Sequence, residues 1–146
     1  MHPVDWYIRR WEEREMYGVT DPESRPFDLP LFRKTLEWVR DEAARPIDER
    51  EWYQGSWTVA GELIGRSCGT AYCFAGYVTH LAGYTIETGT ESIVVTDRGR
   101  ETIPVVADRL LGLTNAESDD LYMSSNSLAA IEIMAEAIVK RRGLAL

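Results

Sequence analysis

The segment from residue 70 to residue 82, TAYCFAGYVTHLA, constrains the fold of this chain more than any other stretch. It is apolar on nearly every side of the helix that it would form, so we expect a helix buried in most directions. Gly76 in its interior costs helix stability relative to alanine, which favours a close crossing with another helix there. Gly83 is expected to end this helix. A helix of this kind predicts a fold in which further helices surround it.

Helical periodicity elsewhere predicts those surrounding helices. Asp28 precedes one of them and is expected to cap it through its carboxylate. Thr114 and Glu117 form the pattern of a capping box, in which each side chain bonds the other residue's backbone N–H. The five expected helices are residues 3–17, 29–44, 106–112, 114–123 and 128–142.

One region has strand character instead. Two runs rich in β-formers, residues 91–96 and 101–106, flank a turn at residues 97–100, which predicts a β-hairpin. Pro104 cannot donate to a strand ladder, so it confines the second strand to a sheet edge. The expected fold class is therefore mainly α, with about six helices around the central helix 70–82 and one small hairpin at about 91–106.

The chain of 146 residues is long enough for one domain with its own core. Residues 18–30 contain three prolines and little periodicity, which indicates a linker or surface loop. We therefore divide the chain into an N-terminal helical arm with a Pro-rich linker, residues 1–28, and a single globular helical domain, residues 29–146.

Aromatic residues in the arm are the candidates for binding a partner. Trp6, Trp11 and Tyr17 are expected to be exposed on it, and exposed aromatic side chains are typical of protein interfaces. The alternative is that the arm packs on the chain's own core. Trp52 and Trp57 are too bulky to remain in water, and we expect them to be structural residues against the core.

The charge of the chain limits its partners. Twenty-four acidic and 16 basic residues give a formal net charge of −8, which disfavours nucleic-acid binding by direct basic contact and docking on anionic lipid. An acidic protein can instead imitate DNA toward a DNA-binding protein, and this alternative stays open. The N-terminus is charged rather than apolar, and no stretch approaches a membrane span, so we expect a cytoplasmic protein without membrane contact.

Cys68 and Cys73 are the two cysteines, and they raise the question of thiol chemistry. Cys68 lies at the expected helix start, where the helix dipole favours a thiolate. His80 would lie about 18 Å from Cys68 and about 10 Å from Cys73 along the helix, too far to activate either thiol. Two cysteines and two histidines also fall short of a typical zinc site, so no metal and no cofactor is expected. Cys73 is expected to be a core residue, and Cys68 stays a weak catalytic candidate.

Three motifs in order give a resemblance to a known family: CGTAYCFAG at residues 68–76, LAG at 81–83 and LGLT at 111–114. This resembles an uncharacterised family of small proteins from phages of actinobacteria and from bacteria, with the pattern CGTxxCxAG, LAG and LGLT. The resemblance covers about residues 30–142. It implies a phage-type gene class and no particular activity.

These observations favour a non-enzymatic, phage-type accessory protein that acts by protein–protein interaction. Its expected partner is a host protein, with a regulatory or defence role, in the cytoplasm of the host cell. The first alternative is a thiol-dependent enzyme or redox-sensitive protein that uses Cys68. The second is the acidic DNA mimic.

Overall fold

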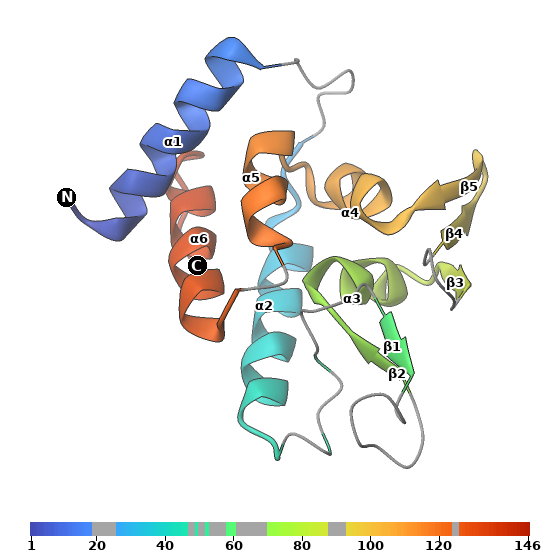
Figure 1. Ribbon diagram of the computed structural model, residues 1–146. Coiled ribbons are helices and arrows are strands. Elements are labelled where there is room, and N and C mark those ends of the chain that lie inside the picture. The colour runs from blue at the N-terminus through green and yellow to red at the C-terminus, as the bar shows by residue number, and fades with distance from the viewer. Residues whose placement is uncertain are drawn as a thin grey trace.

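The computed structural model describes residues 1–18, 26–46, 49, 52, 58–60, 70–87, 93–123 and 126–146. These residues form six helices and five short strands, which confirms the mainly α fold with a small β element (Figure 1). The helices are α1 (Pro3–Tyr17), α2 (Leu29–Ala43), α3 (Phe74–Leu81), α4 (Ile103–Leu111), α5 (Asn115–Leu121) and α6 (Leu128–Lys140). The strands are β1 (Thr58–Ala60), β2 (Thr70–Tyr72), β3 (Thr85–Glu87), β4 (Ile93–Thr96) and β5 (Gly99–Thr102).

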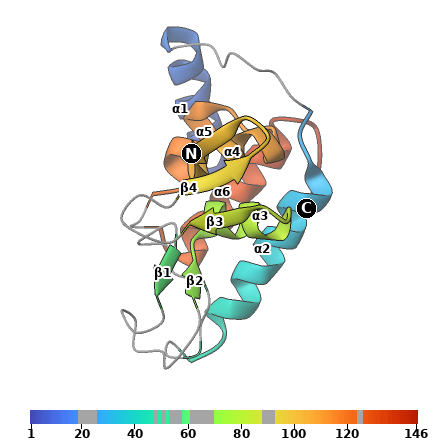
Figure 2. The same cartoon turned by 90° about the vertical axis from the view of Figure 1, so that its right-hand side faces the viewer.

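Helix α1 lies at one edge of the molecule, against α6 and α5, and the strands lie at the opposite edge (Figure 1). Strands β1 and β2 form one antiparallel sheet, and β3, β4 and β5 form another in that order. Figure 2, seen from the strand side, shows both sheets in front of the helices. The hydrophobic core runs between the helices and includes Phe32 of α2, Phe74 of α3 and Ile138 of α6.

The predicted helix caps are confirmed. Asp28 accepts a hydrogen bond of 3.0 Å from the Leu31 backbone N–H at the start of α2. Thr114 and Glu117 form the reciprocal capping box at the start of α5. Gly83 follows α3 with a φ of +87°, a left-handed conformation that glycine adopts without strain.

The predicted central helix is shorter than expected. It begins at Phe74, because Cys73 has extended backbone and its Sγ accepts a hydrogen bond of 3.2 Å from the Gly76 N–H. Residues 70–72, which we expected in the helix, form β2 and pair antiparallel with β1. The prediction was wrong here because a strand depends on a partner from elsewhere in the chain, which local periodicity does not reveal.

The second strand of the predicted hairpin, expected at 101–106, is Gly99–Thr102 instead, and residues 91–92 of the first strand lie outside the described residues. Thr96 pairs with Gly99, so the turn consists of Asp97 and Arg98 alone. Pro104 is not on an edge strand: it lies in the first turn of α4, where a missing N–H leaves no hydrogen bond unmade. The hairpin also gains β3 as a third strand, which pairs with β4.

Candidate functional site

Helix α1 presents two faces of different chemistry. Successive helical residues turn by about 100°, which puts Val4 and Trp11 on one side and Trp6 and Tyr17 on the other. The burial follows this division. Trp11 has no exposed surface and Val4 is buried, while Trp6 is 49% exposed and Tyr17 is 87% exposed.

Trp11 is therefore not the exposed residue that we expected. Trp11 and Val4 belong to the same hydrophobic core as the other helices. Of the two expectations for the N-terminal helix, packing on the chain's own core is the one that the structure has. Trp11 is unavailable to a partner in this conformation, and Trp6 and Tyr17 remain accessible.

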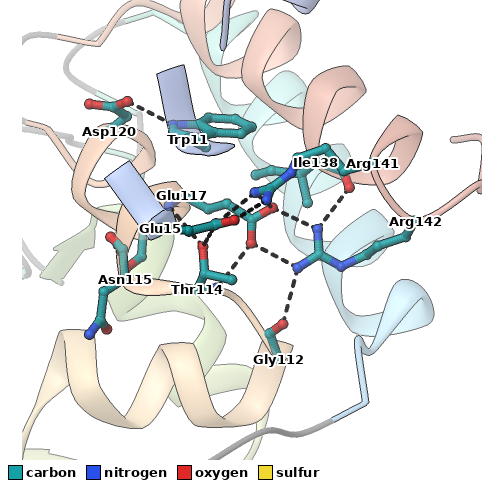
Figure 3. A network of polar contacts seen from close by, with 11 residues as sticks. Trp11, Glu15, Gly112, Thr114, Asn115, Glu117, Asp120, Ile138, Arg141 and Arg142 are labelled. Atoms are coloured by element: carbon teal, nitrogen blue, oxygen red, sulfur yellow. Dashed lines mark hydrogen bonds and ion pairs between the residues drawn. The ribbon is translucent and has the colours of Figure 1, made fainter. Parts of the chain in front are cut away.

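A network of charged side chains lies beneath α1, and its centre is Glu117, which has no exposed surface (Figure 3). Each Glu117 carboxylate oxygen accepts a hydrogen bond of 2.7 Å from the Arg142 guanidinium. The guanidinium of Arg141 lies 3.0 Å from one of these oxygens, and the Thr114 N–H donates to the other at 2.9 Å. The buried charge is thus compensated on all sides, as a buried carboxylate requires.

Glu15 connects α1 to this network. One of its oxygens accepts hydrogen bonds of 2.9 Å from Arg141 and 2.7 Å from the Thr114 hydroxyl. Burial alone would raise the pKa of Glu15, but these hydrogen bonds outweigh it and hold the pKa below its usual value. The Arg141 guanidinium also lies 5.7 Å from the ring centre of Trp11, within cation–π range.

Asp120 of α5 makes the second connection to α1. Its carboxylate accepts 2.8 Å and 2.9 Å hydrogen bonds from the Trp11 indole N–H and from Arg10. Arg14 lies 3.5 Å from its other oxygen. Aromatic packing, charged hydrogen bonds and ion pairs together attach the inward face of α1 to α5 and α6.

The outward face of α1 is different. Besides Trp6 and Tyr17, it carries Met16, which is 73% exposed. Arg9 and Glu13 lie between these apolar residues and are both exposed. Neither makes a hydrogen bond or an ion pair with any residue in the described part of the chain. This face therefore combines apolar side chains in water with charges that lack a partner there.

The cysteine segment does not form a site in the described residues. Cys68 and Trp57 lie outside them. Burial raises the pKa of the Cys73 thiol to about 12, so this sulfur stays protonated and is a poor nucleophile. Trp52 is partly buried and packs against the core, as expected. Gly76 is buried in α3, and the close helix crossing proposed for it stays a prediction.

A second buried polar cluster lies between α4 and α5. The Ser118 hydroxyl donates a hydrogen bond of 2.8 Å to Asp108. Burial, together with the charge of Asp108, raises the pKa of the Tyr122 phenol well above its usual value. The phenol therefore stays neutral, and the cluster has the chemistry of a structural contact between helices.

The sequence analysis did not identify Arg9, Glu13 and Met16 as residues that share the exposed face of α1 with Trp6. The available signal was their helical spacing, which puts all four on the side opposite Trp11. It also treated Glu117 only as a cap. Its ion pairs with Arg141 and Arg142 join two helices, and local pattern does not show such contacts.

Within the described ranges, no group of three or more His, Cys, Asp or Glu side chains could hold a metal ion. None of the helices described there is both long and apolar enough to cross a membrane. No protein-family model, no curated protein and no solved structure matches this chain. The resemblance to the phage family therefore stays a prediction.

Proposed function

We propose that this protein acts by protein–protein contact, with the outward face of α1 as its contact surface. The observation that carries the proposal is the exposure of Trp6 and Tyr17 on a helix whose other face is anchored in the core. Tryptophan and tyrosine are the residues that most often dominate binding energy at protein interfaces. Because the helix is already formed and anchored in the core, binding through it costs less conformational entropy than binding through a flexible segment.

The class of partner follows from the sequence resemblance. A phage-type accessory protein would meet a host regulatory or defence protein in the host cytoplasm, and we retain this as part of the proposal. The exposed side chains Arg9, Glu12 and Glu13 would contribute charges of both signs around the aromatic contacts. The proposal assigns no reaction to the chain.

Affinity capture from an actinobacterial lysate tests the proposal. The baits are the wild-type chain, a Trp6→Ala/Tyr17→Ala double variant and a Val105→Ala control. Val105 is 52% exposed on α4, away from α1, so its truncation removes apolar surface of similar accessibility. We expect a protein that wild type and control retain and that the double variant loses. Identical captured sets for all three baits would contradict the proposal.

A further inference from the structure

The outward face of α1 has an internal symmetry. Arg9 lies two residues before Trp11 and Glu13 two residues after it; Trp6 lies five residues before and Met16 five residues after. All four are on the side of the helix opposite Trp11. Arg9 and Glu13 therefore lie at equal distances along the helix on either side of Trp11, and so do the apolar residues Trp6 and Met16.

This arrangement is complementary to its own copy in the reverse direction. With a rise of about 1.5 Å per residue, Arg9 lies about 3 Å below the level of Trp11 and Glu13 about 3 Å above it. A second helix turned end for end about that level would bring Arg9 opposite the partner's Glu13, and Trp6 opposite the partner's Met16. A two-fold axis repeats each contact, so the pair would contain two ion pairs and two tryptophan–methionine contacts.

We infer that, when no host partner is bound, this face is occupied by a second copy of this chain, packed antiparallel through α1 about a two-fold axis at the level of Trp11. The inference rests on the proposed contact surface and names the molecule that covers it in the purified protein. A second copy would account for the two features that distinguish the outward face of α1 from the inward face, namely its exposed apolar side chains and its charged side chains without partners in the described residues. Arg9 and Glu13 gain partners of opposite charge, and Trp6 and Met16 leave water together, in a pairing of sulfur and ring that is favourable.

The position of α1 permits this contact. Figure 1 shows the helix at an edge of the molecule, with α6 and α5 on one side only. The 15 residues of α1 limit the contact to about 21 Å of helix, which makes a small interface. Small interfaces give weak, concentration-dependent association, so the dimer is expected in the micromolar range and above.

Charge reversal separates self-association from other binding. Arg9→Glu and Glu13→Arg each place two pairs of like charges across the two-fold axis. We expect either variant of the full chain to raise the dissociation constant of the dimer at least tenfold in analytical ultracentrifugation. Glu37→Arg on α2 changes an exposed acidic residue away from this face, and it is expected to leave the constant unchanged.

Mixing the two variants provides the decisive measurement. Arg9→Glu carries two acids at these positions and Glu13→Arg carries two bases, so an equimolar mixture has opposite charges at both contacts. We expect the mixture to form a 1:1 heterodimer, and the Arg9→Glu/Glu13→Arg double variant to dimerise like the wild type. Trp6→Ala, which loses both tryptophan contacts, should weaken the dimer without altering charge.

Wild-type protein that stays monomeric up to millimolar concentration would overturn the inference. So would a mixture of the two single variants that fails to associate. If either happens while Trp6→Ala/Tyr17→Ala still loses a captured lysate protein, the contact surface stands and its occupant is a foreign protein. If the captured sets are also identical, the proposed function fails as well.

Discussion

The two faces of α1 carry the same kinds of residue and differ in what surrounds them. Trp11, Glu15 and Arg14 point inward, and each has a defined partner on α5 or just after α6. Glu13 and Arg9 are exposed to solvent, and Trp6 is half exposed, with its ring in contact only with Tyr7 and Arg10 of the same helix among the described residues. Residue type alone therefore does not separate a structural role from a binding role on this helix. Direction around the helix does, because it decides whether the core or water meets the side chain.

Among the substitutions that test this comparison, Trp11→Ala is expected to have the largest effect on stability. The substitution removes a fully buried indole together with its hydrogen bond to Asp120. We expect it to lower the free energy of unfolding by about 3–5 kcal/mol, the usual cost of truncating a buried aromatic residue. Urea denaturation followed by circular dichroism measures this. A loss below 1 kcal/mol would mean that α1 is not anchored in the core.

The second test breaks the charged network at its centre. Glu117→Gln leaves Arg141 and Arg142 without the buried carboxylate between them, and we expect a loss of about 3 kcal/mol. Asp5→Asn is the matched control, because the ion pair of Asp5 with Lys140 is exposed to solvent and contributes little to stability. Equal losses for the two variants, again from urea denaturation, would contradict the comparison.

The third test uses pH. The pKa of Glu15 is lowered in the folded chain, so the ionised form is favoured by folding. Its contribution is complete above the ordinary pKa of about 4.5 and is lost as pH falls through the folded value. We expect the stability difference between wild type and Glu15→Gln to shrink as pH is lowered from 6 toward 3. A difference that stays constant over this range would show that the charge is not what stabilises the contact.

The smallest effect is expected on the outward face. Trp6→Ala should change the free energy of unfolding by no more than about 0.5 kcal/mol, because half of the side chain is already in water. The measurement is the same denaturation at low protein concentration, where any dimer has dissociated. A loss comparable with that of Trp11→Ala would assign Trp6 to the core instead.

Much of the helical structure could be predicted because its signals are local. Asp28 and the Thr114–Glu117 box are read from adjacent residues, and α1 begins and ends where its periodicity predicts. The errors occur where a distant segment decides. Residues 70–72 form a strand because β1 pairs with them. Pro104 suits either an edge strand or a first helical turn, and local sequence does not choose between them.

The exposed face of α1 could be predicted only in part, because helical spacing is a local signal whereas burial depends on distant segments of the chain. Trp6 and Tyr17 are exposed, as expected, whereas Trp11 is buried. The spacing of Trp11 from Val4, which puts both on one side of the helix, was the signal for its burial. The interhelical partners of Trp11 come from more than 100 residues later in the chain. No local pattern identifies Asp120 as its acceptor.

The helical class, most helix boundaries and the presence of charged residues on both faces of α1 can be read from the sequence, because each depends on the order of neighbouring side chains. The fold of the whole chain sets which face of α1 is covered, which arginines neutralise Glu117, and that residues 70–72 form a strand outside the central helix. Those outcomes depend on contacts between segments far apart in the chain, where packing and desolvation outweigh local preference.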